Sequence, residues 1–155
     1  MALNLLKNKK IMSRHPLKKH HIIKPDPFYD SILIQKIINQ LMKKGKKTLA
    51  RKILNQAIQQ IEEKTQQDPV YIIEQAVANV TPAVEIKARR IGGAVYSIPI
   101  ELSSERGIST AIRWMIDCCN KKSGQSFVSK LTNEIIDASK KMGSAIRKKI
   151  GRAHV

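Results

Sequence analysis

The sequence predicts a mainly α-helical protein, a bundle of five to six helices from which one β-hairpin arm projects. Apolar residues recur at intervals of three and four over five stretches of the chain, as on one face of a helix. One stretch, residues 84–102, instead alternates around the pair Gly92-Gly93. The length of 155 residues and the 42% of hydrophobic residues suit a single folded domain with its own core.

Three segments are expected along the chain. Residues 1–24 form a basic N-terminal arm, with seven basic side chains and no acidic one. Pro25-Asp26-Pro27 ends the arm, because proline disfavours a helix before it and fixes a turn. Residues 25–150 form one helical domain that includes the hairpin at about 84–102, and residues 151–155 form a short tail.

The first half of the domain reads as three helices. Apolar periodicity predicts one over residues 32–42, and residues 43–47, four lysines around a glycine, end it in a cationic turn. A second helix is expected over residues 49–61. Asp68-Pro69 reads as an N-cap followed by proline at the first helical position, and Thr81-Pro82 closes this third helix.

Residues 84–102 read as the hairpin. Apolar and polar residues alternate on both sides of Gly92-Gly93, which is a strong signal for two strands and a tight turn. No other strand is predicted, and a lone two-stranded ribbon is marginal in water. We therefore expect an arm that projects from the helical body with its tip resting on something else.

The remaining residues predict three more helices. Ser103-Ser104 caps a fourth helix with a clear apolar stripe. Ser126 opens a fifth, with Met142 facing inward and Gly143 closing it. Residues 144–155 are basic and begin a short sixth helix.

The cysteines and aromatic residues are expected mainly inside the protein. Cys118 and Cys119 are adjacent, so they are expected to be two free thiols on a helix rather than a disulfide or a zinc site. Most of the six aromatic side chains fall at predicted core positions, and Trp114 is expected in the core or as half-buried support. A protein that reads single strands by stacking would need a cluster of exposed rings.

The charge predicts a polyanionic partner. There are 29 basic against 12 acidic residues, a formal charge of +17, and a pI near 10.1. The cations concentrate in the arm and the turns, which suits folded RNA gripped by its backbone and shape. A helical DNA-binding regulator is the alternative, although its recognition helix would expose Arg, Asn or Gln towards base edges.

Catalysis, metals and membranes find little support. There is no phosphate-binding glycine loop, no pair of acids at metal-binding or acid–base spacing on one face, and no nucleophile with a nearby base. An enzyme, including one acting on RNA, is therefore disfavoured, and no cofactor, metal or catalytic residue is expected. No apolar run approaches the 18 residues of a membrane span.

Several motifs occur in a specific order along the chain. They are Pro25-Asp26-Pro27-Phe28-Tyr29, Gly45-Lys46-Lys47, Gln67-Asp68-Pro69, Val80-Thr81-Pro82, Val84-Glu85-Ile86-Lys87-Ala88-Arg89-Arg90-Ile91-Gly92-Gly93, Ala111-Ile112-Arg113-Trp114 and Ala145-Ile146-Arg147-Lys148-Lys149. In this order, from about residue 12 to 149, the chain resembles the bacterial-type small-subunit ribosomal protein seven family. The family's helical fold with a projecting ribbon agrees with the pattern above.

The resemblance implies a function in translation. Members of the family bind the 3′ major domain of the small-subunit rRNA, start assembly of the subunit head, and lie near the messenger RNA and the exit-site tRNA. The implied partners are that rRNA, neighbouring ribosomal proteins of the head and platform, mRNA and exit-site tRNA, with no membrane.

The resemblance also assigns residues to these contacts. The hairpin cations expected to face the exit site are Lys87, Arg89 and Arg90. The residues expected to contact rRNA are Arg14, Lys18, Lys19, Lys24, Lys46, Lys47, Arg51, Lys121, Lys122, Arg147, Lys148 and Lys149.

The sequence departs from the family at both ends, and its composition suggests the kind of genome that encodes it. The family's usual start corresponds to Met12-Ser13-Arg14, so residues 1–11 are expected to be either an extension or the product of an upstream start site. The family continues with a longer helix after residues 147–149, whereas the sequence here ends at Val155. The 21 Lys and 23 Ile with 7 Gly suggest an AT-rich genome. We expect an organelle ribosome, a plastid before a mitochondrion, with the cytoplasm of an AT-rich bacterium as the alternative.

Overall fold

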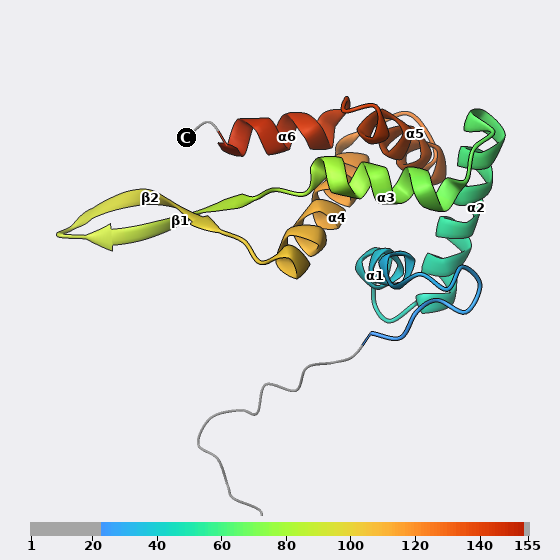
Figure 1. Cartoon of the computed structure of the whole chain (residues 1–155), viewed down its shortest axis with the longest axis horizontal. Coiled ribbons are helices and arrows are strands. Elements are labelled where there is room, and N and C mark those ends of the chain that lie inside the picture. The colour runs from blue at the N-terminus through green and yellow to red at the C-terminus, as the bar shows by residue number, and fades with distance from the viewer. Residues whose placement is uncertain (1–22, 154–155) are drawn as a thin grey trace, which may run out of the picture.

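The computed structural model describes residues 23–153 and has a helical body from which one hairpin projects (Figure 1). This confirms the predicted mainly α fold. The elements in chain order are α1 (Ile32–Leu41), α2 (Lys47–Thr65), α3 (Pro69–Val80), β1 (Val84–Ile91), β2 (Ala94–Glu101), α4 (Ser104–Lys121), α5 (Phe127–Ser139) and α6 (Ser144–Ala153).

Polar side chains cap three of the helices. The predicted N-cap Asp68 accepts a hydrogen bond from the backbone N–H of Val70 at 3.0 Å, with Pro69 at the start of α3. Ser126 likewise accepts from the N–H of Ser129 at the start of α5. Ser31 does the same for α1. Ser103 is the N-cap residue of α4, but its side chain makes no capping hydrogen bond.

The core lies around α5, which packs against α2, α3, α4 and α6. Full burial of an aliphatic side chain contributes about 1.5–3 kcal/mol, so this layer holds the body together. The two cysteines are free and buried in α4, as predicted. The largest fully buried apolar side chains are Ile34, Ile38, Leu54, Ile58, Ile61, Ile73, Val77, Val80, Ile112, Leu131 and Ile135.

The hairpin is antiparallel, with Val84 opposite Glu101 and Ile91 opposite Ala94. Gly92 and Gly93 both have positive φ, which glycine adopts without strain and which tight two-residue hairpin turns require. Within the described chain, the hairpin makes several contacts with only one helix, α6, through β1. The ribbon therefore stands clear of the body, as expected.

The end of α5 differs from the prediction. Met142 was expected to face inward on α5, but the helix ends at Ser139 and Met142 is 58% exposed. The chain turns there through Lys141 and Gly143, which both have positive φ. Helical spacing cannot be carried through such a turn, so the apolar side chain of Met142 faces solvent. Helix α6 then continues to Ala153, beyond residue 150, where a tail was expected to begin.

Three of the six aromatic residues are also less buried than predicted. Trp114 is in the core at 4% exposure, as expected. By contrast, Phe28, Tyr71 and Tyr96 are 69%, 59% and 54% exposed. Each belongs to a motif or to a stretch whose apolar residues recur regularly. In the structure, however, Phe28 lies in a turn, Tyr71 on the outer face of α3 and Tyr96 on the ribbon.

Candidate nucleic-acid interface

The turn between α1 and α2 carries the densest cluster of exposed cations in the described chain. Lys43, Lys44, Lys46 and Lys47 all face solvent, and no ion pair involves them within residues 23–153. Lys44 and Gly45 both have positive φ, and the turn is closed by hydrogen bonds from Lys46 N–H to Lys43 O and from Lys47 N–H to Gly45 O. We call residues 43–47 the lysine turn.

The lysine turn contains two residues predicted to contact RNA and two further exposed lysines that the prediction did not include. Lys46 and Lys47 were assigned through the resemblance, whereas Lys43 and Lys44 were not. The signal for them was present, since all four lysines flank one glycine in the sequence. Four like charges this close repel one another in the free protein, and an anion placed among them relieves that repulsion.

A hollow of about 340 Å³ beside the lysine turn brings two further predicted residues, Lys24 and Arg51, together with Lys47. Lys24, Lys47 and Arg51 all line it, together with the amides of Gln35 and Asn39. Cations and amides around one concave surface suit a phosphate with its attached sugar or base. The structure thus joins the end of the arm to the start of α2.

Arg51 also has an internal partner. Its guanidinium Nη2 lies 3.3 Å from Oδ1 of Asp26, a carboxylate that is 1% exposed. The guanidinium carbon lies 5.8 Å from the centre of the Phe28 ring. Arg51 is therefore held in place before any ligand arrives.

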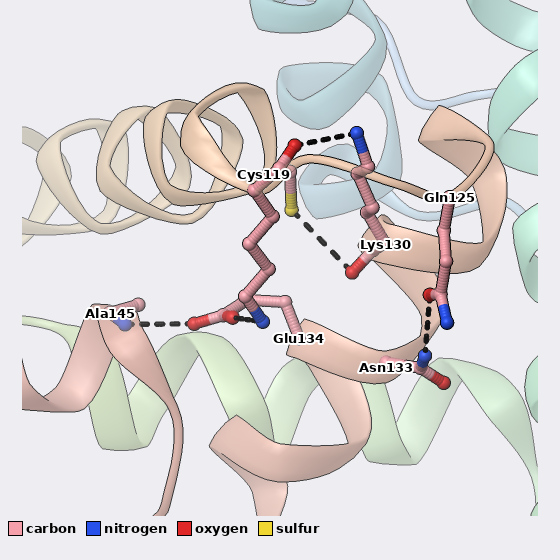
Figure 2. Close-up of polar contacts among 7 residues, drawn as sticks. Cys119, Gln125, Lys130, Asn133, Glu134 and Ala145 are labelled. Carbon is pink, nitrogen blue, oxygen red and sulfur yellow. Dashed lines mark hydrogen bonds and ion pairs between the residues drawn. The ribbon is translucent and has the colours of Figure 1, made fainter.

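Three other predicted RNA contacts are engaged inside the protein. Lys122 pairs with Glu134, which is fully buried and also accepts a hydrogen bond from the N–H of Ala145 (Figure 2). The hydrogen bond from Lys122 to Glu134 raises the pKa of the Lys122 ammonium, despite an opposing effect of burial. This pair joins the end of α4 to α5 and to the start of α6.

Lys148 and Lys149 anchor α6 to the body. Lys148 Nζ lies 3.4 Å from Oδ2 of Asp117 and 5.7 Å from the centre of the Trp114 ring. Lys149 Nζ donates to the backbone oxygen of Asn79 at 2.7 Å. These lysines have a structural role that sequence position alone did not reveal. Lys121 and Arg147, by contrast, are exposed.

The hairpin presents its cations on both faces. Arg89 is opposite Tyr96 and Arg90 is opposite Val95 in the ladder. Successive residues of a strand point to opposite faces, so Lys87 and Arg89 share one face and Arg90 lies on the other. All three are exposed. The acid nearest the base of β1, Glu85, is already paired with Arg106 at 2.9 Å.

The remaining predicted contacts, Arg14, Lys18 and Lys19, lie outside the described residues. In residues 23–153, no three His, Cys, Asp or Glu side chains cluster as metal ligands would. No helix in the same part of the chain is long and apolar enough to cross a bilayer.

These features define a class of protein: a small, strongly basic helical scaffold whose exposed cations include a lysine-rich turn and a projecting ribbon, as is typical of proteins that bind nucleic acids. Residues 12–153 match the family described as ribosomal protein S7p/S5e. The chain is 49% identical to the small ribosomal subunit protein uS7c of Chlorella vulgaris and 52% identical to that of Tupiella akineta, over 89% of this chain and 88% of each relative. It is 51% identical, over the same shares, to the small ribosomal subunit protein uS7 of Acaryochloris marina.

The chain belongs to the ribosomal protein S7p/S5e family, in its chloroplast and bacterial form. It is a structural constituent of the ribosome and not an enzyme. The resemblance identified from the motifs is confirmed.

Proposed function

We propose that this chain binds the 3′ major domain of the small-subunit rRNA directly and nucleates assembly of the subunit head. In the finished particle it contacts neighbouring head and platform proteins, and its hairpin lies beside the mRNA and the exit-site tRNA. The names of its relatives as small ribosomal subunit proteins support this proposal, as does the order of motifs in the sequence.

The lysine turn is the observation that carries the proposal. Its four lysines are exposed and make no ion pair within the described chain, whereas Lys122 and Lys148 are paired internally. Each lysine that neutralises a phosphate releases a condensed counterion, which gives favourable and salt-dependent binding. The adjoining hollow with Lys24 and Arg51 extends this cationic surface along the start of α2.

The hairpin supports the second half of the proposal. It extends away from the helical body in Figure 1, while the lysine turn lies in that body, between α1 and α2. A protein anchored on rRNA through the lysine turn can therefore reach a second ligand with Arg89 and Arg90. We assign that ligand to the exit-site tRNA and the adjacent mRNA.

We place the protein in a plastid ribosome. The relatives from Chlorella vulgaris and Tupiella akineta are uS7c proteins, and the bacterial relative of comparable identity is from Acaryochloris marina. The Lys- and Ile-rich composition agrees with an AT-rich genome such as an organelle's.

The test is a titration of a 3′ major-domain rRNA fragment with the intact protein and with Lys46→Glu/Lys47→Glu, over a salt series. Duplex DNA and an unrelated folded RNA serve as competitors. The parent protein is expected to remain bound to the rRNA fragment in the presence of either competitor. The double variant is expected to bind at least about tenfold more weakly and with a smaller salt slope, because it has lost two phosphate contacts.

The matched control is Lys140→Glu/Lys141→Glu. It makes the same charge change on the exposed turn between α5 and α6, on the other side of the body in Figure 1. An equal loss of affinity in both double variants would mean that only net charge matters. Equal binding of the parent to all three nucleic acids would refute specific rRNA recognition. The protein would then be either a non-specific polycation or a DNA-binding protein.

A further inference from the structure

Phe28 is a large apolar side chain placed in water by a well-defined turn. Its ring is 69% exposed, while its neighbour Tyr29 packs against the core. The backbone N–H of Phe28 donates to Oδ2 of Asp26 at 3.2 Å, and the N–H of Asp30 donates to the backbone oxygen of Asp26 at 2.8 Å. These bonds fix the chain so that the ring of Phe28 points outward.

Asp26 organises both the ring and a cation beside it. The same carboxylate that holds the Phe28 backbone also lies 3.3 Å from the Arg51 guanidinium. Arg51 in turn lies 5.8 Å from the centre of the Phe28 ring. A buried acid thus preorganises an exposed aromatic ring and a guanidinium next to each other, which lowers the entropy lost when a ligand binds.

The hollow next to this pair is lined by polar and basic residues and by no acid. It has a volume of about 380 Å³ and runs from Phe28 along α2. Its lining includes Arg51, Lys52, Asn55, Gln56 and Gln59, and no carboxylate contributes to it. Amide side chains can both donate to and accept from a base edge, and a lysine can neutralise a phosphate.

We propose that Phe28 and Arg51 form a stacking platform for an unpaired nucleobase of the bound RNA. The base stacks on the Phe28 ring, the amides of Gln56 and Gln59 contact its edge, and Lys52 contacts the adjoining phosphate. This inference rests on the proposed function and deepens it, since it names a site for a single-stranded nucleotide beside the phosphate-binding lysine turn. The surrounding cations and amides favour RNA over a protein partner.

The test compares the parent with Phe28→Ala and Phe28→Tyr in binding to the same rRNA fragment. Loss of one stacked base is expected to weaken binding by about 5- to 100-fold in Phe28→Ala, while Phe28→Tyr retains most of the affinity. The salt slope of Phe28→Ala should equal that of the parent, because no phosphate contact is removed. Chemical probing of unpaired bases should show lost protection at one short stretch of the RNA.

Tyr71→Ala is the matched control, because Tyr71 is 59% exposed on α3, away from the platform. It should bind as the parent does, and thermal unfolding should show that all three variants are folded. Parent-like binding by Phe28→Ala would overturn the platform and leave the proposed function intact. If Phe28→Ala bound RNA as the parent does but lost a contact to a neighbouring ribosomal protein, the stacking platform would also be overturned, because the Phe28 ring would then bind a protein partner. A parent without specific rRNA binding would refute the proposed function itself.

Discussion

The helical body and the hairpin of this molecule use their side chains in opposite ways. In the body, apolar residues such as Leu54 are fully buried, and cations such as Lys122 and Lys148 are engaged with Glu134 and Asp117. In the hairpin, Ile91, Val95 and Tyr96 are more than half exposed.

This difference shows where stability and recognition lie. The interior of the body buries its apolar side chains, pairs cations such as Lys122 and Lys148 with acids, and gains its stability from burial. The hairpin leaves apolar and cationic groups exposed to solvent. Binding of an external partner can bury these groups and so gain the free energy that folding alone does not. The role of a cation in this protein therefore depends on its surroundings. Lys148 holds α6 against the body, whereas Arg90 is available to a ligand.

The largest expected effect tests the comparison directly. Leu54→Ala removes a side chain with 0% exposure and should lower the free energy of unfolding by about 2–5 kcal/mol. Tyr96→Ala removes a larger side chain from the hairpin and should change it by less than about 0.5 kcal/mol. Urea denaturation of both variants measures this. Equal losses would show that the hairpin is part of the core.

An intermediate effect concerns Cys119 in the body. Burial, reinforced by Glu134, raises the pKa of its thiol from 9.0 to about 12. The folded protein therefore favours the neutral thiol, and the associated stability is present below pH 9 and is lost as the pH rises from 9 towards 12. The unfolding free energy of the parent should fall more steeply over this window than that of Cys119→Ala, by about 1 kcal/mol per pH unit. Urea denaturation at pH 8 to 11 under reducing conditions checks this, and parallel pH curves would contradict it.

The smallest expected effect is on a shortened hairpin. Replacing residues 88–97 with Asn-Gly keeps Lys87 opposite Ile98, the pair found in the ladder, and supplies a favourable tight turn. The free energy of unfolding should change by less than about 1 kcal/mol, because the removed residues are exposed. Binding to the 3′ major-domain fragment should persist, while protection of exit-site nucleotides should be lost in reconstituted subunits. A loss of cooperative unfolding would refute the independence of the hairpin.

The periodicity of apolar residues, together with the capping and turn residues, was sufficient to predict the elements of the fold. The cap at Asp68, the turn at Gly92-Gly93 and the separate hairpin all follow from local residue chemistry. Met142 was wrongly placed because its side-chain direction depends on where α5 ends, and helical spacing does not report the positive φ of Lys141.

The candidate site was predicted less completely. The sequence showed a cationic turn at residues 43–47, but only the family resemblance assigned Lys46 and Lys47 to RNA, and Lys43 and Lys44 were not assigned. The internal partners of Lys122, Lys148 and Lys149 come from distant segments, and pairing between segments cannot be read from residue type. The exposure of Phe28 was missed for the same reason, since it depends on hydrogen bonds to Asp26.

The two-stranded hairpin has a further consequence for the protein before it reaches its partners. Among residues 23–153 the sheet contains only β1 and β2, so each strand has one edge unpaired within this part of the chain, and another copy of the protein can join it. Lys87, Arg89 and Arg90 oppose this self-association, because like charges on two approaching ribbons repel each other. Salt screens that repulsion, so the free protein should become less soluble as ionic strength rises through the range that also weakens its hold on RNA.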